Sequence, residues 1–269
     1  MNVNKKLIDI KDRIEERSKD SRSDYLKKIK FSSEHSKSAR KNMGCSNIAH
    51  AFASCDKAQQ NQGANGGTVI GVVSAYNDML SAHAPLKDYP DIIKNSAEKR
   101  NAIARVAGGV PAMCDGITQG EPGMELSLFS RDVIALSTAV AFSHNVFDAG
   151  ICLGVCDKIV PGLVIGALSF GHLPIAIIPA GPMPTGISNE EKSSNRKKYA
   201  SGEIDRSALR SSEQSAYHSS GTCTFYGTAN TNQLIMEVMG RQLPSASFFQ
   251  PSTKERLLLI DKTVECILD

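Results

Sequence analysis

The sequence has few of the features that mark a membrane protein or a nucleic-acid-binding protein. No run of about 18 apolar residues is present, so no segment is long enough to cross a bilayer as a helix. The net charge is only +3, which provides no basic excess for binding nucleic acid. The first 30 residues alternate acidic and basic side chains and lack the apolar core of a secretory signal. We therefore expect a cytoplasmic protein.

Cysteines are also few for a disulfide-stabilised fold. The chain has seven of them in 269 residues, an odd number without the density of a small secreted domain. In a reducing compartment such thiols are unreacted, buried or metal-bound. The length and the 41% apolar content allow one large domain or two small ones.

Short apolar runs alternate with helical stretches through the middle of the chain. This alternation predicts an α/β fold, with a mainly parallel sheet covered by helices on both faces. The predicted strands are residues 68–76, 106–113, 149–155 and 174–179, and the predicted helices between them are residues 85–105, 126–144 and 161–170.

The two ends of the chain differ from this core. Residues 1–42 are predicted to be an N-terminal helical extension that ends in a polar connector, and residues 43–269 the α/β domain. Residues 59–67 are predicted to be a loop. Towards the C-terminus we expect polar, solvent-facing helices at residues 188–220, a short strand at 245–249 and an amphipathic helix at 253–269.

Polar residues follow the predicted strands at the points where the strands end. Asn77 and Asp78 follow the first strand, Asp115 the second, and residues 156–158 the third. The carboxyl ends of parallel strands share one edge of the sheet, where ligand sites gather. Asp115 and Asp157 carry the oxygen donors that Mg²⁺ prefers. The pattern predicts a site at this edge.

Three cysteines lie in polar turns punctuated by glycine. Cys45 lies in Gly-Cys-Ser-Asn, Cys156 in Gly-Val-Cys-Asp-Lys, and Cys223 in Gly-Thr-Cys-Thr-Phe-Tyr-Gly-Thr-Ala-Asn-Thr-Asn. A helix predicted after Cys156 is expected to lower the pKa of this thiol and to favour binding to iron. Three thiolates can hold an iron–sulfur cluster with one open iron, which acts as a Lewis acid towards a substrate hydroxyl. The hypothesis is a lyase.

Four segments resemble the dihydroxy-acid and phosphogluconate dehydratase family. They are residues 74–83, 106–120, 154–162 and 221–233, within a resemblance that runs from about residue 43 to 249. The combination of Cys-Asp-Lys with Thr-Ala-Asn-Thr is highly specific. The Thr-Phe-Tyr-Gly insert and the Tyr-Asn-Asp run favour the phosphogluconate branch. The resemblance implies dehydration of 6-phospho-D-gluconate to 2-dehydro-3-deoxy-6-phospho-D-gluconate, a step of the Entner–Doudoroff pathway.

The resemblance also implies cofactors and residue roles. It implies an iron–sulfur cluster, with 4Fe-4S favoured over 2Fe-2S, and a Mg²⁺ ion. It further implies a carbamylated lysine beside the magnesium and polar side chains that line the substrate cavity. In this sequence the cluster ligands are Cys45, Cys156 and Cys223, the magnesium ligands Asp115 and Asp157, the catalytic lysine Lys158, and the substrate-binding residues Asn77, Asp78 and His83; the hydroxyls of Thr222, Thr224 and Thr228 could bond the cluster sulfurs, and His50 could join the cavity.

Each candidate also has a structural interpretation. The cysteines could be buried packing residues, and Asp157 with Lys158 could be an ion pair at a helix start. A lone histidine is more often a satisfied structural residue than a ligand. Cys114 adjoins Asp115, yet we favour a structural role for it. We expect inert packing for Cys55, Cys152 and Cys266.

Three other functions remain open. Family members are longer and carry a C-terminal barrel domain that supplies a serine base and another magnesium ligand. We expect that domain to be absent here, so the chain could be a non-catalytic half that binds a complementary C-terminal chain. It could also be a cluster-carrying redox protein, or a dehydratase of another sugar acid or dihydroxy acid. For the enzyme we expect a sugar-acid phosphate substrate and a homodimer.

Overall fold

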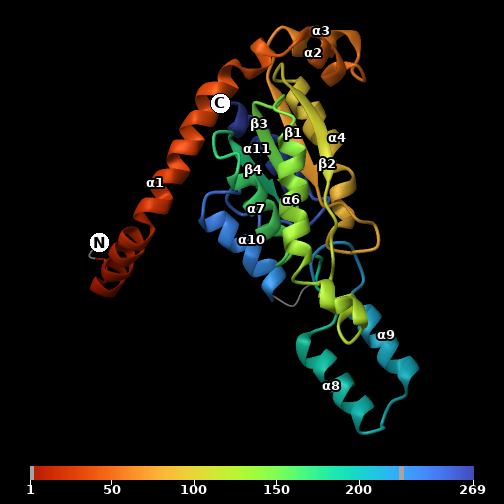
Figure 1. The fold of residues 1–269 in the computed structure, drawn as a ribbon. Helices are drawn as coiled ribbons and strands as arrows, with labels where there is room; N and C mark the ends of the chain where they lie inside the picture. The colour runs from red at the N-terminus through yellow and green to blue at the C-terminus, as the bar shows by residue number, and fades with distance from the viewer. Residues whose placement is uncertain (1–2, 224–226) are drawn as a thin grey trace.

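A four-stranded, all-parallel sheet forms the centre of the molecule (Figure 1). The computed structural model describes residues 3–223 and 227–269. The strands are β1 (Val69–Ser74), β2 (Ile103–Gly109), β3 (Ala149–Leu153) and β4 (Ile175–Ile178), in the spatial order β2-β1-β3-β4. The predicted α/β fold with a parallel sheet is confirmed.

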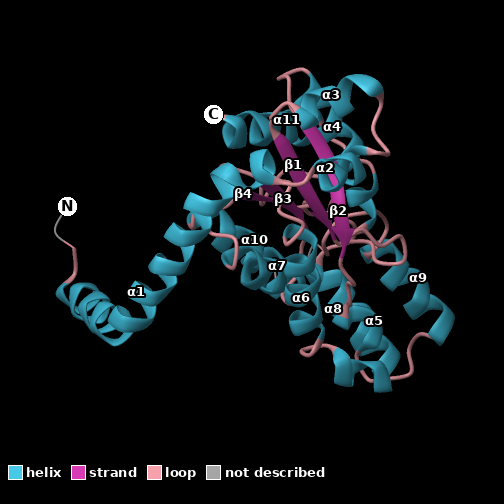
Figure 2. Ribbon diagram, turned by 45° about the horizontal axis from the view of Figure 1, so that its top comes forward, coloured by secondary structure: helices cyan, strands magenta, loops and turns pink. Residues whose placement is uncertain are grey.

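Helices cover both faces of this sheet (Figure 2). On one face α6 (Ser130–Phe142) packs against α7 (Ile159–Leu168), and on the other α4 (Tyr89–Glu98) packs against α11 (Lys254–Leu268). Every residue of β1 and β3 is therefore buried, which explains their uninterrupted apolar sequences.

The strand order places a topological switch point at the carboxyl edge of the sheet. After β1 the chain returns through α4 to β2 on one side, and after β2 it crosses through α6 to β3 on the other side of β1. The connection that leaves β1 and the connection that leaves β2 thus run in opposite directions along the sheet. In open parallel sheets this switch point is where ligands bind.

Elements outside the sheet lie at its two ends. Helices α2 (Cys45–Phe52) and α3 (Lys57–Ala64) lie at the amino edge, at the top of Figure 1, and α8 (Asn189–Ala200) and α9 (Arg206–Ala216) lie beyond the carboxyl edge. The predicted polar helices at 188–220 are confirmed. The remaining elements are η1 (Ala84–Lys87), α5 (Asp115–Thr118), η2 (Pro122–Leu126) and α10 (Thr228–Val238).

The N-terminal segment is a single helix, α1 (Lys5–Asn42), which extends away from the body in Figure 1. Tyr25 donates a hydrogen bond to the Leu168 carbonyl at 2.9 Å, and Arg40 forms an ion pair with Asp148 at 2.9 Å. The predicted polar connector before residue 42 is wrong, because the helix continues as far as this second anchor. Across the described residues, we find no helix with the length and apolarity needed to cross a membrane.

Three other predicted boundaries are wrong. The loop predicted at 59–67 contains most of α3, whose start is capped by the Asp56 side chain. The helix predicted to reach residue 105 ends at Glu98, and β2 begins at Ile103. Residues 245–249 form turns instead of a strand, because Glu237 accepts hydrogen bonds from the amides of Ser245 and Ser247 at 2.6 and 3.0 Å.

Candidate functional site

Backbone hydrogen bonds join loops from distant parts of the chain at the carboxyl edge of the sheet. The amide of Gly221 donates to the Ser81 carbonyl at 2.7 Å, and the amide of Met183 donates to the Thr222 carbonyl at 2.9 Å. These bonds hold the segment before α10 against the loop that follows β1. The polar residues after β1, β2 and β3 therefore share one site with Thr222 and its neighbours.

Lys158 lies at the centre of this site, with only 4% of its side chain exposed. Its ammonium group forms ion pairs with Asp157, at 3.0 Å, and with Asp115. Burial alone would lower the pKa of Lys158, but the hydrogen bonds to the two carboxylates outweigh burial and raise this pKa. Carboxylates from the ends of β2 and β3 thus converge on one positive charge. This arrangement is the ion pair that the sequence left as one of two interpretations.

Neighbouring hydroxyl groups fix the two carboxylates. Ser127 donates a hydrogen bond to Asp115 at 2.6 Å, and Thr228 donates one to Asp157 at 3.2 Å. Burial pushes the pKa of Asp115 upwards, yet the hydrogen bonds from Lys158 and Ser127 outweigh it, so the pKa is lowered. Asp115 is therefore ionised at neutral pH. Its two oxygens are held in place and carry the negative charge that a cation binds.

Cys156 follows β3 and is buried, with a backbone φ of 78°. This left-handed conformation is uncommon for a residue with a Cβ and marks local strain of the kind found at functional sites. Burial raises the pKa of the Cys156 thiol, and nearby Cys114, Asp157 and Cys223 raise it further, while Lys158 lowers it. The prediction that the following helix lowers this pKa is wrong, because burial dominates.

Cys223 and Cys114 lie near Cys156. Burial raises the pKa of the Cys223 thiol, and Cys114 adds to the effect. Because Cys114 acts on both other thiols and electrostatic interactions weaken with distance, the three sulfurs share one region. Asn230 donates to the Cys223 carbonyl at 3.0 Å and accepts from the Thr222 hydroxyl at 2.6 Å, which positions this segment. Thr224 lies outside the described residues.

Cys45 is not brought to this region. It is exposed and is the first residue of α2, at the opposite edge of the sheet. The chain runs from α2 through α3 into the start of β1, and the six residues of β1 span about 20 Å at the usual rise per residue. The structure therefore corrects the prediction that Cys45 converges with Cys156 and Cys223.

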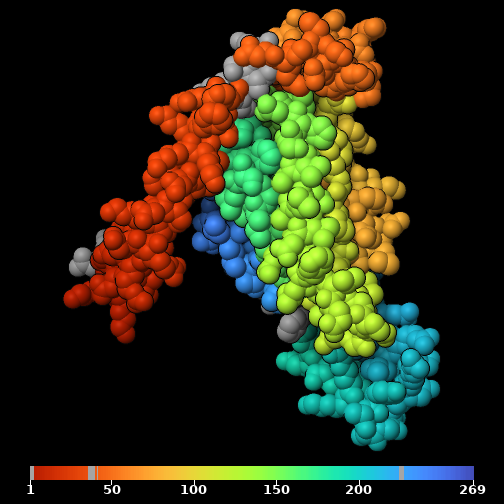
Figure 3. All heavy atoms as spheres, viewed as in Figure 1, coloured from red at the N-terminus to blue at the C-terminus, as the bar shows by residue number. Residues whose placement is uncertain are grey.

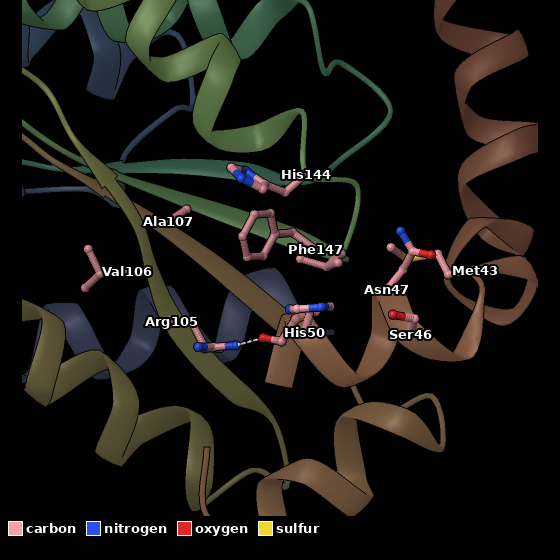
Figure 4. A pocket seen from close by; sticks show the side chains of 11 residues that line it. Met43, Ser46, Asn47, His50, Arg105, Val106, Ala107, His144 and Phe147 are labelled. Carbon is pink, nitrogen blue, oxygen red and sulfur yellow. Dashed lines mark hydrogen bonds between the residues drawn. The ribbon is translucent and has the colours of Figure 1, made fainter. Parts of the chain in front are cut away.

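A cavity of about 540 Å³ lies beside α2, and its lining contains none of Cys114, Cys156 and Cys223 (Figure 4). Its lining includes His50, His144, Phe147 and Arg105, and Arg105 is held by a hydrogen bond to the Ala51 carbonyl. His50, predicted to lie near the substrate, therefore faces a different cavity.

The three predicted substrate-binding residues occupy the loop after β1 but differ in accessibility. Asp78 is exposed, and Asn77 is half-buried and accepts a hydrogen bond from the Met79 amide at 2.9 Å. His83 is fully buried, with Nε2 3.3 Å from the Val155 carbonyl. Burial lowers its pKa to about 4, so the ring is neutral and Nε2 donates to that carbonyl. Its buried position supports the structural interpretation.

Among the described residues, no three His, Cys, Asp or Glu side chains surround a position for a single metal ion. The carboxylates instead meet at Lys158, and the thiols lie beside them. The sequence had assigned Cys114 a packing role. The sequence does contain a pattern that relates Cys114 to Cys156: each of these cysteines is followed directly by an aspartate, Asp115 or Asp157.

The sequence of this chain is similar to those of known proteins. The family model described as "Dihydroxy-acid/6-phosphogluconate dehydratase N-terminal" matches residues 68–269. Proteins named phosphogluconate dehydratase are similar over almost the whole chain: that of Pseudomonas aeruginosa is 54% identical over 93% of the chain, that of Escherichia coli K12 53% over 94%, and that of Helicobacter pylori strain 26695 52% over 96%.

The similarity covers only part of each relative. The matched region is 41% of the Pseudomonas protein and 42% of the other two. A protein named dihydroxy-acid dehydratase, from Akkermansia muciniphila, is more distant, at 32% identity over 70% of this chain. With a family model that matches most of its length, the chain belongs to the dihydroxy-acid/6-phosphogluconate dehydratase family and contains the N-terminal domain of that family.

Proposed function

We propose that this chain is the cofactor-binding part of an enzyme that dehydrates 6-phospho-D-gluconate to 2-dehydro-3-deoxy-6-phospho-D-gluconate. The observation that carries the proposal is the convergence of Asp115 and Asp157 on Lys158, beside the thiols of Cys156 and Cys223. The names of the relatives at 52–54% identity support the choice of substrate.

The donor set fits a magnesium ion. Two carboxylates, one from the loop after β2 and one from the loop after β3, already share one cationic partner, the Lys158 ammonium, so the site is built to hold positive charge. Carboxylate oxygens are the preferred protein ligands of Mg²⁺. Carbamylation of Lys158 would replace its positive charge with an oxygen donor, and a divalent ion would then take over the charge balance. Asp115, Asp157 and carbamylated Lys158 would hold this ion.

The thiols fit an iron–sulfur cluster. Cys156 and Cys223 approach each other at the carboxyl edge, and burial keeps both from ionising unless a metal compensates the charge. Thiolates are the usual ligands of iron–sulfur clusters, with 4Fe-4S favoured here over 2Fe-2S. When bound, such a cluster and the magnesium ion supply Lewis acidity to the hydroxyl groups and carboxylate of a substrate.

The reaction removes one molecule of water. A base takes the proton from C2 and the C3–O bond breaks, and this proton leaves with the hydroxide as water. The resulting enol then loses its O–H proton and gains one at C3 as it becomes the 2-keto acid. Residues of this chain would orient the substrate, with Asn77 and Asp78 at the open edge of the site. The family resemblance implies that the base belongs to the C-terminal domain of longer members.

A chimeric enzyme tests the proposal. The chain replaces the matching 42% of the E. coli relative, and the chimera is purified anaerobically and assayed for loss of 6-phosphogluconate and gain of a 2-keto acid. We expect activity, and its loss in Asp157→Asn. A chimera that folds and binds iron but consumes no 6-phosphogluconate contradicts the proposal. Consumption of another sugar acid in its place supports the alternative substrate class.

We also propose that the assembled protein is a homodimer. Four exposed apolar side chains repeat at helical spacing: Phe129, the residue that caps α6, and Val133, Leu136 and Val140 within α6. The helix lies on the visible face of the molecule in Figure 3. A row of apolar side chains of this kind is typical of a contact surface. A second copy of the chain is the occupant we expect, and a complementary C-terminal chain is the alternative that the oligomeric state distinguishes.

A further inference from the structure

We propose that Cys114, and not Cys45 as the sequence predicted, is the third sulfur ligand of the iron–sulfur cluster. This inference rests on the proposed function, because it concerns the cluster described above. It changes the ligand set to one thiol after β2, one after β3 and one before α10.

The first argument is the repeated Cys-Asp pair. Cys114 precedes Asp115 in the segment that joins β2 to α5, and Cys156 precedes Asp157 in the loop after β3. Both carboxylates bind the same ammonium group, that of Lys158. Since consecutive Cα atoms are about 3.8 Å apart, this shared contact also brings the two thiol-bearing residues close together. The geometry that pairs the carboxylates therefore pairs the cysteines.

The second argument is the mutual electrostatic effect of the thiols. Beyond burial, Cys114 is the first of the neighbouring groups that raise the pKa of Cys156, and it also raises the pKa of Cys223. Cys114 is thus close to both residues of the proposed ligand pair. Ligation by iron would remove the proton from each thiol and replace mutual repulsion with attraction to the metal.

The third argument is the local structure around Cys114. Its carbonyl accepts hydrogen bonds from the amides of Ile117 and Thr118, at 3.0 and 3.2 Å, which fixes the backbone of the turn. The residue is half-buried, and its sulfur is at ordinary contact distance, 3.5 Å, from the position that a Cβ on Gly116 would take. A fixed backbone with an accessible thiol suits a metal ligand.

Cys45 cannot bind the same cluster as Cys114, Cys156 and Cys223 in this fold. It is exposed on α2, and the length of β1, about 20 Å, separates its edge of the sheet from the other sulfurs. All protein sulfurs of one cluster must reach the same small group. They need not meet at one ion, because each thiolate binds a different iron.

Iron loading of variants tests the assignment. The 269-residue chain is reconstituted anaerobically with iron and sulfide, and iron and sulfide per chain and the electron paramagnetic resonance spectrum after reduction are measured. Cys114→Ser should retain about a tenth of the wild-type iron or less. Cys45→Ser and Cys152→Ala should load normally, since the first is remote and the second is buried within β3. Circular dichroism reports whether each variant folds.

Alkylation of the loaded wild-type chain tests the same point without a substitution. Iodoacetamide should modify the exposed Cys45 and Cys266 but should modify Cys114 only after iron is removed by a chelator. Modification of Cys114 in the loaded chain, or normal iron in Cys114→Ser, overturns this inference alone. A wild-type chain that binds no iron or sulfide overturns the proposed cluster as well.

Discussion

Lys158 extends from the end of β3 to contact Asp115 at the end of β2, although β1 lies between the two strands. The contact therefore bridges the switch point of the sheet. It ties together two loops that are 43 residues apart in the sequence and that carry the carboxylates and two of the cysteines.

Removing the Asp115 charge should destabilise the protein. In Asp115→Asn the buried ammonium of Lys158 keeps only Asp157 as an anionic partner, and we expect a loss of about 1–3 kcal/mol in the free energy of unfolding, measured with urea. Asp91→Asn is the control, because its ion pair with Lys94 is exposed and should contribute less than about 0.5 kcal/mol. Equal losses in the two variants would show that the Lys158 contact does not stabilise the fold.

The ion pair between Arg100, just after α4, and Asp261 of α11 should make stability depend on pH. Hydrogen bonds from Arg100 and Ser96 hold the pKa of Asp261 down to about 2, below its value of 3.8 in an unfolded chain. The stabilisation is therefore present above about pH 4 and is lost as the pH falls through 2. Since 35% of the Asp261 side chain is exposed, screening limits the effect to about 1 kcal/mol.

Thermal unfolding of wild type and Asp261→Asn checks this prediction. At neutral pH the variant should unfold at a lower temperature, and the difference should shrink between pH 4 and pH 2 as Asp261 is protonated. A difference that stays constant over this range contradicts the assigned cause.

Two glycines with positive φ should differ sharply in their tolerance of alanine. At Gly221, φ is 127° and an added Cβ would lie 2.5 Å from the backbone nitrogen of Met183, whereas at Gly202, φ is 80° and no atom lies within 4 Å. We expect Gly202→Ala to cost about 1–2 kcal/mol from backbone strain alone. Gly221→Ala should cost about 3 kcal/mol or more, because the clash adds to the strain. Urea unfolding measures both, and similar losses would argue against the close approach.

The apolar row on α6 should control the oligomeric state. We expect a dimer of the wild-type chain and a monomer of Leu136→Lys in light scattering, because a Leu side chain contributes about 1.5–3 kcal/mol when it is buried and a charge cannot replace it. Leu258→Lys, on α11 at the other face, is the matched control and should remain dimeric. A monomeric wild-type chain contradicts the homodimer and leaves a complementary C-terminal chain as the proposed partner.

The sequence predicted the sheet better than it predicted the site. Strands β1 and β3 were recognisable because helices on both faces require uninterrupted apolar residues. The carboxyl edge could be predicted from Asp115 and Asp157, since parallel strands end together. The position of Cys45 could not, because its Gly-Cys-Ser-Asn turn resembles a ligand turn and only the path through α2 and α3 shows which edge it occupies. The length of α1 likewise depends on its contacts with Leu168 and Asp148, and the turns at 245–249 on hydrogen bonds to Glu237.

The two Cys-Asp pairs have a consequence for how the centre can change. A soft donor and a hard donor are adjacent in the sequence at the ends of both β2 and β3, so any shift of either loop moves both kinds of donor together. A change in the position of the iron ligands therefore also changes the position of the magnesium ligands. Substitutions that change how the cysteines bind iron should also change which divalent cation the carboxylates prefer.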